Sequence, residues 1–142
     1  MVIIDEPTAL IRMGISIVLG MAIGLEREKH HHPAGIRTFM LICMGATLAT
    51  LASIYICQTN TELLNGDPGR IAAQVLTGVG FIGAGLIIKN EDRVSGLTSA
   101  AAIFLTASIG VSIGVGMIVT GCVVTLVTIL ILTSSSISKK KQ

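Results

Sequence analysis

Three glycines in the stretch "TGVGFIGAG", residues 77–85, have the spacing that cradles the phosphates of a dinucleotide in α/β enzymes. Gly78, Gly80 and Gly83 form G-x-G-x-x-G. That chemistry needs a strand before the first glycine, a helix that begins at the loop, and an acidic residue about 20 positions later. Here the glycines lie in the second half of an apolar run, and Thr98 occupies the later position. We therefore interpret them as flat helix surface that lets other helices approach closely.

A polar stripe lies near the beginning of the same apolar run. Arg70, Gln74 and Thr77 are spaced i, i+4 and i+7, which places them on one face of a helix. Asp67 precedes them, and Arg12 lies at a similar depth in the first apolar stretch, where it could pair with Asp67 or with the acids at positions 5 and 6. We call these five residues the outer polar cluster. It is either a small outward-facing pocket, or a set of side chains that reach headgroups and a neighbouring helix.

A second group of polar residues lies in and after "GLEREKHHHPAGIRT", residues 24–38. Glu26 and Arg27 end the first apolar stretch, Arg37 and Thr38 open the second, and Thr98 should lie on the same side of the membrane. We call these five residues the cytoplasmic cluster. They are either helix-end charges, with a salt bridge between Glu26 and Arg37 across a helical hairpin, or a docking surface for another protein.

The residue types that bind metals give weak signals. The histidines at positions 30–32 are adjacent, and adjacent residues rarely converge on one ion, so a solvated and titratable loop is expected. Three cysteines lie in apolar stretches without C-x-x-C spacing and are expected to be buried rather than disulfide-bonded or zinc-bound: Cys43, Cys57 and Cys122. Asp67 is a weak candidate ligand for Mg²⁺, which prefers carboxylate oxygens and retained waters. We expect no cofactor other than this possible Mg²⁺ ion.

The carboxylates are placed unfavourably for an ion path. No Asp or Glu lies near the centre of an apolar stretch, whereas secondary transporters place ion-coordinating groups at the membrane midplane. Glu26 and Asp67 should lie at opposite faces of the membrane, so they cannot share one ion. This arrangement weakens a carrier function without excluding it. No set of nucleophile, base and orienting group suggests an enzyme, and we expect no nucleic-acid partner.

These residues must be positioned by helices in a lipid bilayer. Of the 142 residues, 51% are hydrophobic and only 13% are charged, against about 25% in a soluble domain. The chain is therefore expected to be a single all-α, polytopic membrane domain over residues 1–142. Charge-poor stretches predict five transmembrane helices, over residues 8–25, 38–57, 68–88, 97–113 and 117–133. The last two divide a run that is too long for one span, with a turn at "IGVG", residues 113–116.

Lysine and arginine predict the direction of the spans. With five spans, eight of the ten basic residues lie on one side and two on the other, whereas four spans divide them five to five. The positive-inside rule therefore favours five spans with the N-terminus outside and the C-terminus inside. The terminal "KKK" then faces anionic lipid of the inner leaflet. The acidic start, "MVIIDEPT", is not typical of a signal peptide, so the first span is expected to remain in the mature protein.

Small residues recur at a spacing of four in three of the expected helices. Gly20–Gly24 and Gly110–Gly114 are G-x-x-x-G pairs, and Gly80 is followed by Ala84. Because lipid provides no hydrophobic force between helices, close backbone approach at such residues drives their packing. We therefore expect the first, third and fourth helices to pack tightly, within one chain or between copies, and we expect a homo-oligomer.

Three segments together resemble one membrane-protein family. They are "GLEREKHHHPAGIRTFMLICMGA" (24–46), "DPGRIAAQVLTGVGFIGAGLI" (67–87) and "GLTSAAAIFLTASIGVSIGVG" (96–116), and their order is that of the membrane domain of the MgtC/SapB family. The resemblance covers roughly residues 20–116. The positions that match the family pattern are Glu26, Arg27, Arg37, Thr38, Asp67, Arg70, Gln74 and Thr98.

The resemblance implies a multi-pass protein of the bacterial inner membrane with about five spans. It implies a link to adaptation to low Mg²⁺ and, in some pathogens, to survival inside host cells. Two activities follow from it: regulation through binding of other membrane proteins, such as the F-type ATP synthase or small membrane peptides, and transport of Mg²⁺ or another ion by an oligomer. We favour the first because of the missing midplane acid.

This sequence departs from the family pattern in two places. The third segment reads "SAAAIF" where the family often has a Ser and a Trp, so the contacts of that helix are expected to differ. Many family members also continue into a soluble C-terminal domain, whereas this sequence ends at Gln142. We expect either a short form that lacks that domain or a truncated chain, and a function carried by the domain would be missing here.

Overall fold

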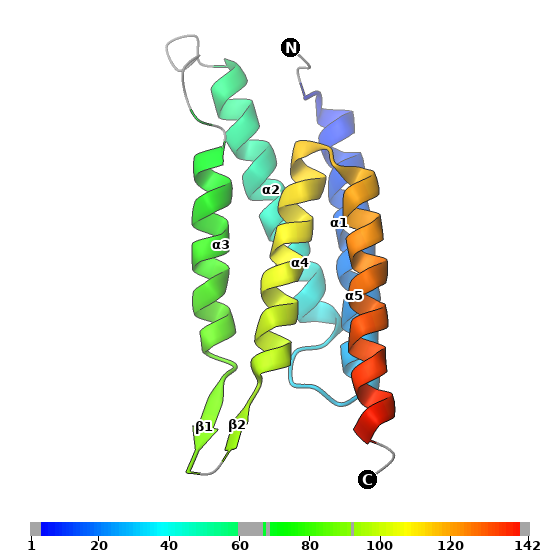
Figure 1. Cartoon of the computed structure of the whole chain (residues 1–142). Helices are drawn as coiled ribbons and strands as arrows, with labels where there is room; N and C mark the ends of the chain where they lie inside the picture. The colour runs from blue at the N-terminus through cyan, green and yellow to red at the C-terminus, as the bar shows by residue number, and fades with distance from the viewer. Residues whose placement is uncertain (1–3, 60–66, 68, 92, 140–142) are drawn as a thin grey trace.

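The computed structural model describes residues 4–59, 67, 69–91 and 93–139, and side chains as far as residue 134. Within them the order of elements is α1 (Glu6–Lys29), α2 (Ile36–Thr59), α3 (Gly69–Ala84), β1 (Ile88–Asn90), β2 (Arg93–Ser95), α4 (Leu97–Val115) and α5 (Ile118–Lys139). The helices run side by side in a bundle (Figure 1). The hairpin of β1 and β2, the α1–α2 connection and the end of α5 share one end of it.

The third helix is shorter than the sequence predicts. A helix that continues to Ile88 is wrong, because α3 ends at Ala84 after 16 residues, a length of about 24 Å. The backbone N–H of Leu86 donates to the carbonyl of Gly83, and residues 88–90 then pair antiparallel with residues 93–95. Glycines on both sides of Ala84 favour the break, and β-branched residues in the hairpin favour extended backbone. Among the described residues, the regular structure is therefore all-helical except for this hairpin.

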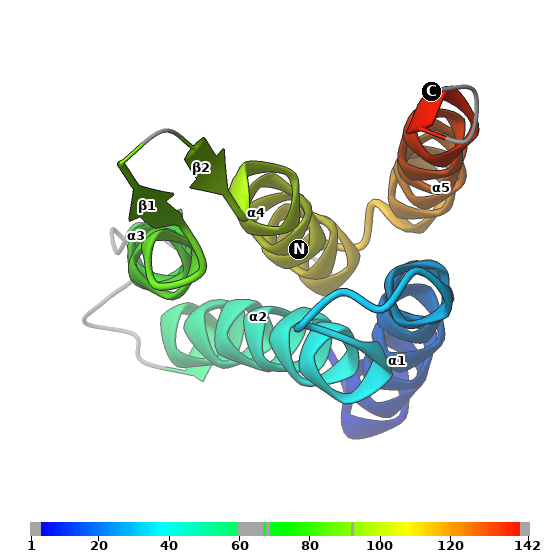
Figure 2. The same cartoon turned by 90° about the horizontal axis from the view of Figure 1, so that it is seen from below.

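The α2 helix lies at the centre of the packing. It contacts α1, α3 and α4, and α4 in turn contacts α3 and α5. Seen along the bundle, α3 and α1 lie on opposite sides, with α2 and α4 between them (Figure 2). The largest fully buried side chains include Phe39 of α2, Ile23 of α1, and Ile103 and Ile113 of α4. The core is therefore formed mainly by α1, α2 and α4.

The G-x-x-x-G pairs of α1 and α4 both contact α2. A Cβ atom added at Gly20 would lie 2.7 Å from the carbonyl oxygen of Phe39, and one added at Gly24 would lie 2.6 Å from Cα of Ile36. A Cβ atom at Gly110 would overlap the carbonyl oxygen of Cys43. Two of the three helices that the sequence predicts to pack through glycine, α1 and α4, therefore meet α2, which has no G-x-x-x-G pair.

The glycines of α3 behave differently from those of α1 and α4. A Cβ atom added at Gly78 or Gly80 would meet nothing within 4 Å, and one at Gly83 would make only ordinary contact, 3.6 Å, with Ala100. Gly78 and Gly80 are therefore not packing positions within the described chain. They leave a smooth, open surface on α3.

The turn between α4 and α5 is built on Gly116. Its φ angle of +99° is left-handed, its N–H donates to the carbonyl of Ile113, and the N–H of Met117 donates to that of Ser112. These two bonds form a Schellman motif, a common helix ending at glycine. The break lies at residues 116–117, at the end of the "IGVG" segment from which it is predicted.

Three described helices are long and apolar enough to cross a membrane: α1, α2 and α4. The α5 helix has a shorter apolar part, Ile118–Ser134. Large apolar side chains are exposed on the outside of the bundle, including Phe81 at 84% and Val119 at 77%. Such a surface fits lipid rather than water as the surrounding solvent. Pro68, where the third span is expected to begin, and the terminal Lys140 and Lys141 lie outside the described residues.

Candidate functional site

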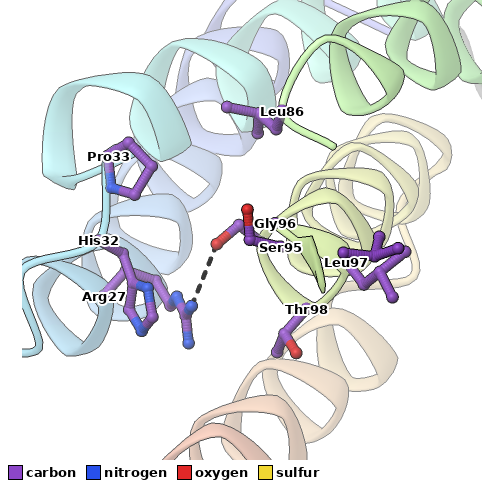
Figure 3. A pocket seen from close by; sticks show the side chains of 10 residues that line it. Arg27, His32, Pro33, Leu86, Ser95, Gly96, Leu97 and Thr98 are labelled. Carbon is purple, nitrogen blue, oxygen red and sulfur yellow. Dashed lines mark hydrogen bonds between the residues drawn. The ribbon is translucent and has the colours of Figure 1, made fainter. Parts of the chain in front are cut away.

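A buried arginine lies where α1, α4 and the α1–α2 connection meet. Arg27, in the last turn of α1, is 3% exposed. One of its guanidinium nitrogens, Nη2, donates a hydrogen bond of 3.2 Å to Oγ of Ser99, a buried residue in the first turn of α4 (Figure 3). This bond joins residues 72 positions apart in the chain. It fixes the guanidinium beside the N-terminus of α4.

Glu26 is the second buried charge of this region. Its carboxylate lies 3.6 Å from Nη1 of Arg27 and 3.2 Å from Nδ1 of His30, and the residue is 7% exposed. The salt bridge expected between Glu26 and Arg37 is therefore wrong. Arg37 is exposed and borders a small apolar groove beside Met40 and other residues of α1 and α2. Arg37 is the second residue of α2. The partners of Glu26, by contrast, lie at the end of its own helix, at Arg27 and His30.

A cavity of about 490 Å³ opens next to Arg27 (Figure 3). Three segments line it: the end of α1 with the α1–α2 connection, the junction of α3 with the hairpin, and the hairpin's exit into α4. The lining residues are Arg27, His32, Pro33, Leu86, Val94, Ser95, Gly96, Leu97, Thr98 and Ser99. None of them is acidic. We call this space the Arg27 cavity.

The first turn of α4 forms one wall of the Arg27 cavity. The helix begins after Gly96, whose φ angle is +89°, and no side chain caps it. A Cβ atom at this position would overlap the carbonyl oxygen of Leu86, so glycine is required by both conformation and space. The first N–H groups of an α-helix have no partner within the helix, and they carry partial positive charge. The wall therefore presents hydrogen-bond donors.

Two buried polar atoms beside this cavity have no hydrogen-bond partner among the described residues. They are Nε of Arg27 and Oε2 of Glu26. Buried donors and acceptors are normally satisfied, and an unsatisfied one costs about 1–3 kcal/mol or more when charged. Of the two residues, Arg27 lines the cavity, so its Nε is the donor that a bound ligand could satisfy.

The remaining members of the cytoplasmic cluster are spread around this end of the bundle. Thr98 lines the Arg27 cavity and is exposed, while Thr38 is half-buried near the start of α2. The structure therefore brings Arg27 and Thr98 to one cavity, places Glu26 directly behind Arg27, and leaves Arg37 and Thr38 outside it.

The outer polar cluster is not assembled within the described chain. Nη1 of Arg12 donates a hydrogen bond of 2.7 Å to the carbonyl of Gly114 at the end of α4, so the expected pairing with an acid is wrong. Arg70, Gln74 and Thr77 are exposed on α3, on the other side of the bundle. The physical reason is topological, because α2 and α4 separate α1 from α3 (Figure 2).

Two members of the outer polar cluster make local contacts. Oδ1 of Asp67 accepts a hydrogen bond of 2.8 Å from the N–H of Gly69, the first residue of α3. The hydroxyl of Thr77 donates to the carbonyl of Ala73 in its own helix. Asp67 therefore has a capping role, which occupies one of its oxygens.

Within the described residues, no three His, Cys, Asp or Glu side chains come close enough together to hold a metal ion. His30 instead contacts Glu26, through its backbone carbonyl at 2.9 Å and its carboxylate. The three cysteines are free thiols: Cys43 is buried and Cys57 half-buried, but Cys122 is exposed. The expectation that all three are buried is wrong for Cys122, which lies on the outward face of α5.

Two residues of this region, Ser99 and Glu28, are not predicted from the sequence. Ser99 is one of three small polar residues near the start of α4, and only the packing of α1 on α4 selects it as the partner of Arg27. Glu28 caps α2, because its Oε2 accepts a hydrogen bond of 3.0 Å from the N–H of Ile36. An acid shortly before an "AGI" helix start is a signal from which this cap could have been predicted.

Comparison with known proteins places the chain in a family. The model of the MgtC family matches residues 13–140. The "Putative magnesium transporter YhiD" of Escherichia coli (strain K12) is 44% identical over 125 residues, which cover 87% of this chain and 58% of that protein. "Protein SapB" of Bacillus subtilis (strain 168) is 40% identical over 114 residues, 78% of this chain and 49% of that protein.

"Protein MgtC" of Brucella abortus (strain 2308) is 40% identical over 105 residues, which cover 72% of this chain and 41% of that protein. The chain thus spans about half the length of the curated relatives that it matches. No solved structure matches it. The match over nearly the whole chain confirms the resemblance read from the three sequence segments, and the chain belongs to the MgtC family.

Proposed function

We propose that this chain is a protein of the bacterial inner membrane that supports Mg²⁺ homeostasis by binding and regulating other membrane proteins. In this proposal it crosses the bilayer five times, with its N-terminus outside and its C-terminus inside, and it catalyses no reaction. Candidate partners are a membrane subunit of the F-type ATP synthase, a small membrane peptide, or a second copy of the chain. The link to Mg²⁺ is supported by the family and by the name of the Escherichia coli relative, "Putative magnesium transporter YhiD".

The observation that carries the proposal is the outward face of α3. Arg70, Gln74 and Thr77 are exposed there, although α3 packs against α2 and α4 on its other side. Gln74 lies inside the apolar part of the helix, where lipid would leave its amide without partners, whereas the hydroxyl of Thr77 bonds to the carbonyl of Ala73. Gly78, with nothing within 4 Å of its added Cβ atom, leaves room beside them for another helix. A helix of a partner protein would satisfy both features.

The length of α3 supports the same conclusion. Its 16 residues span about 24 Å, less than the roughly 30 Å of a hydrocarbon core. A short helix beside lipid requires local thinning of the bilayer, tilting of its neighbours or association with other helices. Contact with a partner along the exposed face of α3 would reduce the lipid-facing perimeter of this helix.

The alternative function is transport of Mg²⁺ or another ion by an oligomer. The observation that favours it is again the polar face of α3, since several copies could surround a shared polar path with Gln74 and Thr77 along it and Asp67 at its entrance. Within the described residues a single chain offers no group of three acidic, His or Cys ligands, so the path would depend on the assembly.

Photo-crosslinking tests the partner-binding proposal. A photoreactive amino acid at Thr77 is compared with the same group at Val119, which is exposed on α5. The protein is co-reconstituted with purified F-type ATP synthase, and ATP-driven proton pumping is measured in the same vesicles. We expect an adduct from Thr77 but not from Val119, and pumping that changes with the amount of the chain. Equal adducts from both positions, with unchanged pumping, would reject the ATP synthase as the partner.

An ion-flux measurement decides between the two functions. The chain is reconstituted in liposomes with a Mg²⁺-sensitive dye inside, beside Asp67→Asn and protein-free vesicles. We expect no Mg²⁺ entry above that of the protein-free vesicles. Entry that exceeds this background and falls in Asp67→Asn would establish transport and displace the regulatory proposal.

A further inference from the structure

We propose that the Arg27 cavity binds a phosphoryl group, with the Arg27 guanidinium and the first turn of α4 as its ligands. This inference concerns a ligand site at the end of the bundle that carries the hairpin. It does not depend on whether α3 binds a partner, and it assigns a chemistry to residues that the proposed function does not use.

The first argument is the uncapped start of α4. This helix has 19 residues and begins without a side-chain cap, so the N–H groups of its first turn have no partner within the helix. Helix N-termini attract anions because these N–H groups and the helix dipole carry partial positive charge. Leu97, Thr98 and Ser99 supply these groups, and all three line the cavity.

The second argument is independent and concerns Arg27. Its side chain is 4% exposed, it lines the cavity, and its Nε finds no hydrogen-bond partner among the described residues. The bond to Ser99 holds the guanidinium against the wall that α4 forms (Figure 3). A guanidinium presents several donors in a planar fork that matches the oxygens of a phosphate. A buried arginine whose Nε is unsatisfied can therefore bind an anion that enters the cavity.

The charges around the cavity select an anion over a cation. None of the described residues that line the cavity is acidic, whereas Arg27 and His32 are basic. Glu26 pairs with Arg27 at 3.6 Å but is not among the described residues that line the cavity. Its charge balances Arg27 when the cavity holds no anion, and it should weaken binding to some extent. A divalent cation would meet Arg27 and the positive end of α4 without a carboxylate.

The size of the cavity is compatible with two sources of the same chemistry. Its volume of about 490 Å³ exceeds what a phosphate ion fills, and part of its wall is apolar, at Leu86, Val94 and Leu97. Free inorganic phosphate could enter from the aqueous side. A phospholipid could instead place its headgroup phosphate against Arg27 with its glycerol and chains along the apolar wall. Both would use the same donors.

Binding of inorganic phosphate is measured first, by calorimetry and by thermal unfolding of the purified chain in detergent at constant ionic strength. Chloride serves as the reference anion. A second arm places the chain in nanodiscs of phosphatidylcholine with or without phosphatidic acid, and native mass spectrometry counts the retained lipid. We expect saturable phosphate binding, or selective retention of phosphatidic acid, and either outcome identifies the source.

Variants connect the binding to the site. We expect Arg27→Gln to weaken binding at least about tenfold, because it removes a charge-assisted ligand. The matched control is Arg37→Gln, an arginine near the same end of the bundle that does not line the cavity, and we expect it to bind as the unaltered chain does. Equal binding by Arg27→Gln and the unaltered chain would overturn the proposal, as would the absence of binding in both arms.

A second variant keeps the test decisive if Arg27→Gln does not fold. Glu26→Gln retains Arg27 and removes the competing negative charge 3.6 Å from it. We expect this variant to bind the anion several-fold more tightly, an increase that a purely structural role of the pair would not produce. Unchanged or weaker binding by folded Glu26→Gln would also overturn the proposal.

Discussion

The guanidinium of Arg12 in α1 donates a hydrogen bond of 2.7 Å to the backbone carbonyl of Gly114, in the last turn of α4. The last carbonyls of a helix have no partner within it, and they carry partial negative charge. Gly116, which ends α4, lies against the same guanidinium, since its added Cβ atom would be 2.9 Å from Nη2. One side chain from the first helix therefore caps the fourth helix at its turn into the fifth.

We expect Arg12→Met to lower the stability of the bundle by about 1–2 kcal/mol. The reason is the loss of a charge-assisted hydrogen bond to a carbonyl that is partly shielded from solvent. Thermal unfolding of the purified chain in detergent measures the effect. Arg37→Met is the matched control, because Arg37 is exposed, and its melting temperature should stay close to that of the unaltered chain. Equal melting temperatures for both variants would show that the cap contributes nothing.

The close contact at Gly110 gives a prediction with an internal control. An added Cβ atom at Gly110 would overlap the backbone of α2 at Cys43, whereas one at Gly78 would meet nothing within 4 Å. We expect Gly110→Ala to push α4 away from α2 and to lose stability. Gly78→Ala should be neutral or slightly stabilising, because alanine favours the helix by up to about 1 kcal/mol. Unfolding of both variants in the same detergent makes the comparison.

A distance measurement between α2 and α4 detects the same displacement directly. Thr47 of α2 lies opposite Gly110, with 2.8 Å between its hydroxyl oxygen and the Gly110 carbonyl. A spectroscopic distance between labels on α2 and α4 should lengthen in Gly110→Ala and stay unchanged in Gly78→Ala. If Gly110→Ala leaves both the distance and the melting temperature unaltered, α2 and α4 are not packed through this glycine.

Much of the helical framework could be predicted from the sequence because charge placement and helical length are local properties. The turn at Gly116 follows from the length of the charge-free run, and the close approach of α1 and α4 to another helix follows from their glycine pairs. The identity of that helix could not be predicted, because α2 carries no G-x-x-x-G pair. The early end of α3 at Ala84 also escaped prediction, since an apolar run of this kind fits helix and strand equally well.

The site was only partly predictable, for a different reason. Their place at the end of an apolar stretch and their match to the family pattern marked Glu26 and Arg27 as candidate site residues. Their partners depend on which helices are neighbours, so Ser99 could not be assigned to Arg27, and the salt bridge from Glu26 to Arg37, one of two alternatives, is wrong. The same limit applies to Arg12. Its partner is the backbone carbonyl of Gly114, and every residue has such a carbonyl, so the sequence does not single it out.

The conformation of Gly96 leads to a further prediction. Gly96 and Gly116 both have left-handed φ angles, but their surroundings differ. An added Cβ atom at Gly96 would collide with backbone, the carbonyl of Leu86, whereas one at Gly116 would meet only the flexible end of Arg12. We expect Gly96→Ala to destabilise the hairpin junction strongly and Gly116→Ala to have a smaller effect. Hydrogen exchange of residues 86–99 measures the junction, and similar protection in both variants would contradict this account.

The cap on α2 gives the last prediction. Oε2 of Glu28 accepts a hydrogen bond from the N–H of Ile36, and an added Cβ atom at Gly35 would lie 2.7 Å from this same oxygen. Glu28 is exposed, so part of its charge is screened by solvent. We expect Glu28→Ala to cost about 0.5–1 kcal/mol, as the loss of a helix cap does, and Glu28→Gln to cost less, because an amide oxygen can still accept the bond.

The control is Glu91→Ala in the turn of the hairpin. Chemical denaturation in detergent at low and high salt separates the charge from the hydrogen bond: the gap between Glu28→Gln and the unaltered chain should close at high salt, while the gap between Glu28→Ala and Glu28→Gln should persist. If both variants unfold alike at every salt concentration, Glu28 acts by charge alone and not as a hydrogen-bonded cap.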